Sequence, residues 1–541
     1  MPAHAKTLTS QPMSQAELIQ AMLVPEFYPH NPGDVDLVRT HISYVFLAGS
    51  FVYKVKKAVN LGFLDFSTLE KRRHYCREEL RLNRRLAEPI YLDVVPISRG
   101  GENLYPGSSG NDPVVEYAVK MLRIPDRDML HHRLAAEEVD LQVMDRLAVT
   151  IADFHARAEA DADIASRGCV ENILQNVEEN REQTRSFLGD LLPAHADEFV
   201  QVYFRYFIDS HRELLRERER SRRIRDCHGD LRTEHVCFYG NELLVIDCIE
   251  FNTRFRHIDV AADVSFLLMD LDYTGFPGYG SRFLDRYVKY ARDPDVMRLS
   301  DFYKCYYAFT KGKVAGLKLR NDALGEQERQ QQREKAEKFF DLAYTYAAQL
   351  KRPALIVTTG LMGTGKSTLA RRLASRLGVE ILRTDELRKE IAGLDPAERR
   401  YERYGQGIYS PEVTRRTYQL AIQRAAWRLD EGRSAIVDAS FKDAANRRLA
   451  METAREHSSD FYLLECVCPE ETLLQRLSQR ELISERVSDG RAELLHRQRQ
   501  DFEPVREIPQ EVHLVVDTSR EIDRCEVRAL KYIRLGIREE R

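Results

Sequence analysis

The sequence lacks the features that mark several specialised classes of protein. It has no apolar stretch of roughly 18 residues, so no membrane-spanning helix is expected. Residues 1–12 lack the apolar core of a secretion signal. Its nine cysteines are scattered and form no two CxxC pairs, which argues against a disulfide framework and a zinc site. These absences predict a cytoplasmic protein with reduced thiols and no membrane partner.

An excess of charge of one sign is also missing. The 82 lysines and arginines nearly balance the 86 aspartates and glutamates, which gives a formal net charge of −4. Chain-wide attraction to nucleic acid or to an anionic membrane is therefore not expected, although a local basic patch could still bind one. There is no internal repeat and no low-complexity tract. With 541 residues, of which 43% are hydrophobic and 31% charged, the chain is expected to form two or more globular domains.

Short apolar segments alternate with helical segments in the C-terminal part. Strands are expected at residues 354–358, 379–382, 435–438, 461–467 and 512–516. This alternation predicts an α/β domain with a parallel sheet and helices on both faces. Pro353 ends the preceding helix, so we expect the domains to be residues 1–350 and 351–541.

The clearest motif is a phosphate-binding loop directly after the first of these strands. The segment Gly-Leu-Met-Gly-Thr-Gly-Lys-Ser at 360–367 fits GxxxxGK[ST] and precedes a helical segment. In this context the backbone N–H groups and the helix N-terminus face phosphates. Lys366 can reach the β- and γ-phosphates, and Ser367 can ligate Mg²⁺. We expect ATP and Mg²⁺ to be bound here, by Gly360, Leu361, Met362, Gly363, Thr364, Gly365, Lys366, Ser367 and Thr368.

Two carboxylates and a pair of arginines follow in the same domain. Asp385 and Asp438 each come at the end of an expected strand, beside the crevice where such sheets bind ligands. Asp385 could accept the proton of an acceptor hydroxyl, and Asp438 could hold the magnesium ion or its water. A helix at 471–480 and a polar loop at 484–490 are expected to form a lid over the transferred phosphate. The pattern does not separate its Arg476 from Arg480, and Arg480 is our catalytic candidate.

The part from about residue 353 to 541 resembles the P-loop kinase family that includes polynucleotide 5′-kinases, gluconate kinases and chloramphenicol phosphotransferases. The resemblance rests on the phosphate-binding loop, on Arg-Thr-Asp-Glu-Leu-Arg at 383–388 and on Val-Asp-Ala-Ser at 437–440. It implies that Asp385 is the general base and that Asp438 is a second acidic site. Related kinases share these motifs, so the acceptor is not specified.

The N-terminal part carries the residue types of a second phosphoryl-transfer site, in order. Lys54 lies on a strand of an expected hairpin (40–47 with 51–59), and Glu79 lies in an expected helix at 68–86. Asp230 follows in His-Gly-Asp-Leu, and Asp247 in Ile-Asp. Such a site needs a lysine on the phosphates, a glutamate that holds it, one aspartate at the hydroxyl and one on Mg²⁺. Lys56, on the same strand face, is an alternative to Lys54.

Residues of about 35 to 345 resemble the aminoglycoside phosphotransferase family, whose catalytic loop is HGDLxxxN. The resemblance implies an α+β protein-kinase-like fold in which Asp230 is the catalytic base and Asp247 a metal ligand. His235 stands where the family has its metal-binding asparagine, and either His235 or neighbouring Glu234 is expected to serve the metal. Arg254, Asp259 and Asp263 match a charged segment that we expect to be structural.

Two further segments of the N-terminal part have a recognisable pattern. Residues 227–238 and 243–251 are expected to form paired strands, and the arginine-rich stretch at 212–225 to form a solvated helix face with i,i+4 charge pairs. Fused to the P-loop part, the pattern resembles a bacterial two-domain family.

The sequence thus predicts an ATP-dependent phosphotransferase that acts on a hydroxyl of an unidentified small molecule. One alternative is a polynucleotide 5′-hydroxyl kinase in nucleic-acid repair. The other is an ATP-binding regulatory protein whose kinase-like domain is inactive.

Overall fold

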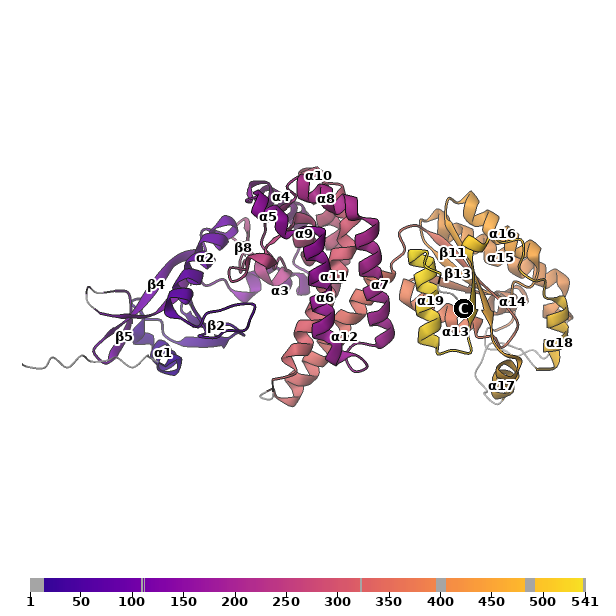
Figure 1. Ribbon diagram of the computed structural model, residues 1–541, viewed down its shortest axis with the longest axis horizontal. Coiled ribbons are helices and arrows are strands. Elements are labelled where there is room, and N and C mark those ends of the chain that lie inside the picture. The colour runs from indigo at the N-terminus through magenta and orange to yellow at the C-terminus, as the bar shows by residue number, and fades with distance from the viewer. Residues whose placement is uncertain are drawn as a thin grey trace, which may run out of the picture. The chain divides into compact units, whose positions relative to one another are not determined.

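A computed structural model describes residues 14–108, 110, 112–321, 324–395, 405–481 and 492–538 (Figure 1). The chain divides into two compact units. The first comprises Met1–Asn180 and Ile208–Ala308, and the second comprises Arg181–Phe207 and Phe309–Arg541. None of the helices in the described ranges is long and apolar enough to cross a membrane.

The first unit begins with a six-stranded antiparallel sheet in the order β1-β2-β3-β6-β4-β5. Helix α2, which Thr68 caps through its side chain, contacts β4 and β6. The predicted hairpin is confirmed as β2 and β3, joined by a turn with Gly49 in the left-handed region. The bounds of this part are α1 (Gln15–Met22), β1 (Val35–Arg39), β2 (Ser43–Ala48), β3 (Phe51–Lys56), α2 (Leu69–Ala87), β4 (Tyr91–Gly100), β5 (Asn103–Pro106) and β6 (Val114–Leu122).

Helices dominate the next stretch, with two short strand pairs, β8–β9 and β7–β10, inserted between them. Helix α9 is buried along most of its length, so it forms the centre of the helical part. The bounds are α3 (Leu130–Ala135), α4 (Gln142–Arg157), α5 (Ala162–Arg167), α6 (Val170–Thr184), α7 (Ala194–Ser210), α8 (Arg212–Arg220), β7 (Ile224–Asp226), β8 (Val236–Tyr239), β9 (Glu242–Val245), β10 (His257–Asp259), α9 (Val260–Thr274), α10 (Pro277–Ala291), α11 (Asp295–Lys318) and α12 (Glu326–Ala348).

One local prediction in this stretch is wrong, and another needs an addition. Residues 227–235 form a loop that ends in a 3-10 turn, and only β8, from Val236 onward, is a strand. The reason is that N–H groups of this loop bind a side chain of α9 and not a neighbouring strand. In the arginine-rich helix α8, Arg218 is buried and pairs with Asp259 and Asp293, each at 2.6 Å. The predicted solvated face is present, since Arg220 pairs there with Glu213 and Glu217, and Arg218 lies on the buried face.

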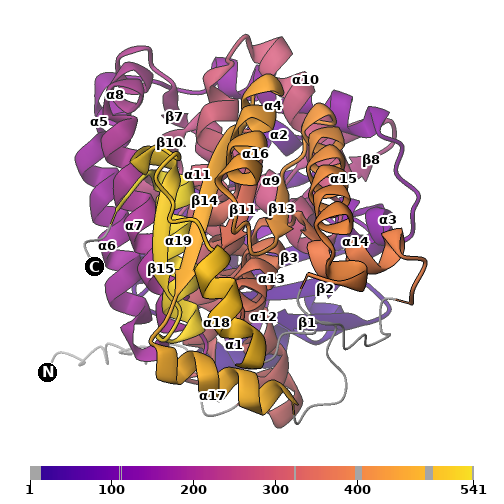
Figure 2. The same cartoon turned by 90° about the vertical axis from the view of Figure 1, so that its right-hand side faces the viewer.

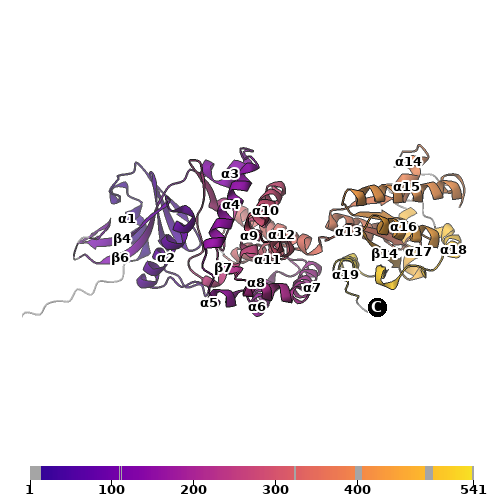
Figure 3. The ribbon, with the colours of Figure 1, turned by 90° about the horizontal axis from the view of Figure 1, so that it is seen from above.

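The second unit contains the predicted parallel sheet, with five strands in the order β12-β13-β11-β14-β15 (Figure 2). Helices α15 and α16 contact each other, and so do α13 and α19 (Figure 3). The bounds are β11 (Ala354–Thr359), α13 (Lys366–Leu377), β12 (Glu380–Arg383), α14 (Thr384–Ile391), α15 (Pro411–Asp430), β13 (Ala435–Asp438), α16 (Ala444–Glu456), β14 (Asp460–Val467), α17 (Glu470–Glu481), α18 (Ala492–Asp501), β15 (His513–Asp517) and α19 (Ile522–Leu535).

Helices from before residue 350 pack in this second unit. Glu526 of α19 is 1% exposed, and its carboxylate accepts hydrogen bonds from Arg372 Nε of α13 at 2.9 Å and from Tyr344 Oη of α12 at 3.2 Å. Lys531 of α19 pairs with Glu198 of α7 at 2.5 Å. Pro353 ends a helix but carries no information on what that helix packs against. The boundary expected at residue 350 therefore differs from the compact units, and independent folding of the two pieces stays a prediction.

We expect Glu526→Gln to lower the free energy of unfolding by about 2–3 kcal/mol. The substitution removes a buried negative charge that pairs with the guanidinium groups of Arg372 and Arg376 in α13. Urea unfolding of the full chain measures the change. Glu521→Gln, at a side chain that is 83% exposed, is the control and should cost at most about 0.5 kcal/mol. Equal losses in the two variants would contradict this role of Glu526.

Candidate active sites

In the first unit, β3 and α2 bring the predicted lysine and glutamate together. Lys54 Nζ lies 2.8 Å from Glu79 Oε1 and 2.6 Å from Asp247 Oδ1. Lys56 points inward from the same strand face, is completely buried, and pairs with Glu79 Oε2 at 2.8 Å and with Glu250. Of the two lysines, Lys54 is the one that contacts Asp247, and Lys56 is held by Glu79 and Glu250.

These ion pairs determine the charge states of the group. Burial lowers the pKa of Lys54, but Asp247 and Glu79 more than offset it, so the pKa lies well above its usual value. Burial raises the pKa of Asp247, yet Lys54 and His235 hold it below its usual range. Lys54 is therefore an ammonium and Asp247 a carboxylate at neutral pH, as phosphate and metal binding require.

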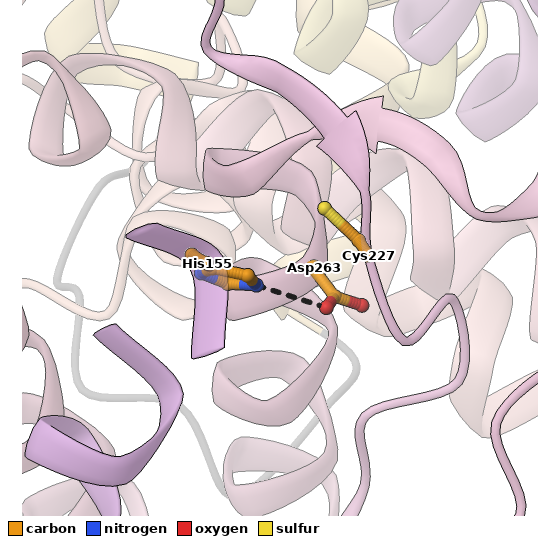
Figure 4. A group of neighbouring side chains, drawn as sticks. All are labelled: His155, Cys227 and Asp263. Carbon is orange, nitrogen blue, oxygen red and sulfur yellow. Dashed lines mark hydrogen bonds and ion pairs between the residues drawn. The ribbon is translucent and has the colours of Figure 1, made fainter. Parts of the chain in front are cut away.

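A buried aspartate of α9 shapes the loop that carries Asp230. Asp263 accepts hydrogen bonds from the N–H of His228 at 3.0 Å, from the N–H of Gly229 at 2.9 Å and from His155 Nε2 at 3.1 Å (Figure 4). Gly229 has φ +83°, and a Cβ there would lie 2.7 Å from the Phe255 carbonyl oxygen. The loop conformation thus requires both the carboxylate and the glycine.

His155, Cys227 and Asp263 lie close enough together to suggest a metal site, with ligand atoms within 4.8 Å of one another. Their atoms are already used, however. His155 Nδ1 lies 2.7 Å from Tyr287 Oη, and the oxygens of Asp263 accept the three bonds described above. Burial, with nearby Asp263, raises the pKa of the Cys227 thiol well above its usual value. The group therefore anchors the loop and offers no ready set of metal ligands.

Asp230, Asp247 and His235 lie together at the end of this loop. His235 Nδ1 is 2.8 Å from the Asp230 carbonyl oxygen, and its Nε2 is 3.6 Å from Asp247 Oδ2. Both carboxylate oxygens of Asp230 accept hydrogen bonds from Arg232, each at 2.7 Å. Sequence reasoning missed Arg232. Its position two residues after the expected base, inside the same short loop, was the available signal.

The phosphate-binding loop of the second unit lies between β11 and α13. Gly360, Gly363 and Gly365 have positive φ angles of +133°, +81° and +84°. A Cβ at Gly360 would lie 2.4 Å from the Cys466 carbonyl oxygen, so the close approach of β14 requires glycine there. Lys366, the first residue of α13, donates to the Leu361 carbonyl oxygen at 2.7 Å. Ser367 and Thr368 follow it in the first turn of the helix.

The two predicted carboxylates lie at the ends of adjacent strands. Asp438 ends β13, next to Arg383 of β12, and Thr358 Oγ1 of β11 lies 3.4 Å from its Oδ1. Asp385 is in the first turn of α14, which begins directly after β12. Thr384 donates to the Asp438 carbonyl oxygen at 3.1 Å and so joins the two strand ends. Both acids therefore lie at the carboxyl edge of the sheet, from which the phosphate-binding loop also leaves.

Arg476 of α17 lies beside the phosphate-binding loop. Its Nη1 is 3.4 Å from the position of a Cβ at Gly365, and its Nη2 donates to the Thr518 carbonyl oxygen at 2.6 Å. Thr518 in turn donates from Oγ1 to the Thr364 carbonyl oxygen at 2.5 Å. The side chain of Arg480 and residues 484–490 lie outside the described residues, so the assignment of Arg480 stays a prediction.

The geometry defines the class of each unit. The first has a protein-kinase-like arrangement, with a lysine–glutamate pair on an antiparallel sheet and two aspartates from the following loops. The second is a P-loop nucleotide-binding domain on a parallel sheet. Both confirm the predicted fold class. A family model described as "AAA domain" matches residues 355–505 of the second unit.

Relatives are found for most of the chain, and similar solved structures for each part. Uncharacterized protein Rv2004c of Mycobacterium tuberculosis (strain ATCC 25618 / H37Rv) is 28% identical over 446 residues, which are 82% of this chain and 86% of the relative. A solved GDP complex of aminoglycoside 2′-phosphotransferase-IIIa covers 60% of this chain and 99% of its own, with 15% identity and a TM-score of 0.39. A gluconokinase from Sinorhizobium meliloti 1021 covers 34% and 95%, with 18% identity and a TM-score of 0.25.

Stability of the first unit should depend on pH through His228. Burial lowers the pKa of this histidine to about 4, against 6.5 when exposed. The unfolded chain therefore binds a proton between these values that the folded chain excludes. Stability contributed by neutral His228 is intact above pH 6.5 and falls by up to about 3 kcal/mol as the pH drops to 4.

We expect His228→Gln to reduce the loss of folding stability between pH 6.5 and pH 4. Urea unfolding at several pH values between 4 and 7 measures it, with His41→Gln, at an exposed histidine, as the control. An unchanged slope in His228→Gln would show that the loop tolerates an imidazolium.

Proposed function

We propose that the chain is an ATP-dependent phosphotransferase with a hydroxyl acceptor, and that the second unit carries out the transfer. The observation that supports this most directly is the grouping at one sheet edge. The loop with Lys366, the strand end with Asp438 and the helix start with Asp385 all lie there. A lysine on the phosphates and two acids of this kind are the groups that phosphoryl transfer needs.

In the proposed reaction, the loop N–H groups and the N-terminus of α13 bind the ATP phosphates. Lys366 exchanges the Leu361 carbonyl for β- and γ-phosphate oxygens and offsets the charge that develops on them. The oxygen of the acceptor hydroxyl bonds to the γ-phosphorus, and Asp385 accepts the proton that this hydroxyl loses. The bond between the γ-phosphorus and the oxygen that bridges it to the β-phosphorus breaks, and ADP leaves.

The residues around the loop fit a magnesium ion. The Ser367 hydroxyl and the Asp438 carboxylate are oxygen donors, which Mg²⁺ prefers. Asp438 is buried, with Thr358 Oγ1 3.4 Å from its Oδ1 and Arg383 Nε 3.7 Å from its Oδ2. A carboxylate oxygen can accept more than one bond, so Asp438 keeps acceptor capacity for a metal ion. Ser367 and Asp438 would hold the ion, and the ion would neutralise the negative charge of the phosphates.

One residue of α14 favours an anionic acceptor. Arg388, one turn after Asp385, is 7% exposed, and its Nη1 donates to the Ile408 carbonyl oxygen and to Thr414 Oγ1, both at 2.9 Å. None of its partners among the described residues is a carboxylate, and its Nε has no hydrogen-bond partner there. The guanidinium carbon also lies 4.8 Å from the centroid of the Tyr409 ring, a contact that favours its positive charge. A carboxylate or phosphate on the acceptor would add an opposite charge and stabilise it further. This keeps the polynucleotide 5′-hydroxyl kinase as the second candidate.

The first unit supports the regulatory alternative as well as a second active site. Lys54 is bonded directly to Asp247, and Arg232 occupies both oxygens of Asp230. A hydroxyl that gives its proton to Asp230 must share these oxygens with the guanidinium of Arg232. The first unit is therefore proposed as an ATP site whose transfer activity depends on the position of Arg232.

Lys366→Ala should weaken ATP binding at least about tenfold, because it removes the charge that the loop places on the phosphates. Calorimetric titration of the full chain with ATP and Mg²⁺ resolves the two sites, and the effect should be confined to one of them. Lys335→Ala, at an exposed lysine of the same unit, is the control. Unchanged affinity at both sites would exclude Lys366 from phosphate binding.

Asp385→Asn should lower turnover by ~10²–10⁴-fold and leave ATP affinity nearly unchanged, because only proton removal is lost. The assay is ATP-dependent phosphorylation over sugars, nucleosides, aminoglycosides and 5′-hydroxyl oligonucleotides. Glu386→Gln, which neutralises the neighbouring acid that pairs with Arg383, is the matched control. If Asp385→Asn turns over at the parent rate, Asp385 is not the general base and another group has that role.

A further inference from the structure

An imidazole and a carboxylate face each other in the first unit. His235 comes from the 3-10 turn Thr233–His235, and Asp247 follows strand β9. The His235 side chain is 10% exposed, and Nδ1 lies 2.8 Å from the Asp230 carbonyl oxygen. A carbonyl oxygen only accepts, so Nδ1 carries the proton and the ring is fixed in one orientation.

This orientation leaves the second ring nitrogen facing oxygens. In the neutral ring with the proton on Nδ1, Nε2 carries a lone pair. Nε2 lies 3.6 Å from Asp247 Oδ2 and 3.9 Å from Glu234 Oε1. Arg232 Nη2 is 3.5 Å away, at the limit of hydrogen bonding, and is already bonded to Asp230 at 2.7 Å. Two acceptors that face each other repel unless a proton or a metal ion lies between them.

Asp247 is held in place for such a contact. Its Oδ1 is bonded to Lys54, and Oδ2 is directed at His235. The backbone has φ +64°, in the left-handed region that an aspartate seldom adopts, and its N–H donates to Tyr91 Oη at 3.1 Å. A residue kept in a strained conformation by several bonds is typical of a ligand site.

We propose that His235 Nε2 and Asp247 Oδ2 form a two-ligand site that binds Mn²⁺ in preference to Mg²⁺. Mg²⁺ favours oxygen ligands and gives up its water reluctantly, whereas first-row transition metals accept imidazole nitrogen together with carboxylate oxygen. The remaining positions suit water or the phosphate oxygens of a nucleotide. The fold would allow a magnesium site here, and the imidazole changes which ion it selects. The inference does not depend on the proposed function of the second unit.

The test uses the full chain and Mn²⁺ without nucleotide. Electron spin resonance counts bound Mn²⁺, and spin-echo modulation detects a directly coordinated ¹⁴N. The parent should show imidazole modulation and select Mn²⁺ over Mg²⁺ by roughly tenfold or more in competition. His235→Asn, which offers an amide oxygen, should lose the modulation and most of the selectivity. His132→Gln, at an exposed histidine, is the control and should keep both.

Asp247→Asn provides a second route, because it keeps the shape of the side chain and removes the charge. It should lower the affinity for Mn²⁺ and abolish the modulation even if His235→Asn folds poorly. The proposal is overturned if bound Mn²⁺ in the parent shows no ¹⁴N modulation or if the modulation survives His235→Asn. It is also overturned if the parent binds no Mn²⁺ in this unit.

Discussion

The placement of Glu79 between two lysines is the interaction on which the first unit depends. Lys54 and Lys56 point inward from one face of β3, and two ammonium groups so close would repel in a buried place. Each oxygen of Glu79 takes one of them, and Glu250 adds a second carboxylate for Lys56. Because Glu79 belongs to α2, the same contacts fix that helix on the sheet. Lys54 is then directed at Asp247, and the charged cluster is complete.

The two units hold their phosphate-binding lysines in different ways. Lys54 is held by two carboxylates, and any ligand must compete with full negative charges for it. Lys366 also donates to the Leu361 carbonyl oxygen, inside the loop that is proposed to receive the phosphates. The first lysine is thus positioned by side chains from distant segments, whereas the second has a contact within its own loop.

The sequence predicts those features that lie in a short segment of fixed spacing. The loop at 360–367 and the alternation of strands and helices after it are local patterns, and they predict the parallel sheet correctly. Long-range partners leave no such pattern. The N–H groups of His228 and Gly229 in the loop at 227–235 bind Asp263, more than thirty residues away, and nothing in the local sequence indicates this partner. In the sequence Arg218 cannot be told apart from the surface arginines around it. Its burial follows from ion pairs with Asp259 and Asp293, which are distant in the chain.

Thr518 shows how far the phosphate-binding domain extends along the chain. The segment that matches the AAA domain family ends at residue 505. Thr518 lies beyond it, after β15, yet it donates a hydrogen bond to Thr364 inside the loop and receives Arg476 on its carbonyl oxygen. A protein cut at the end of the matched segment would keep every residue of the loop and lose the support of its backbone. The smallest complete domain is thus defined by these hydrogen bonds and reaches well past the end of the matched segment.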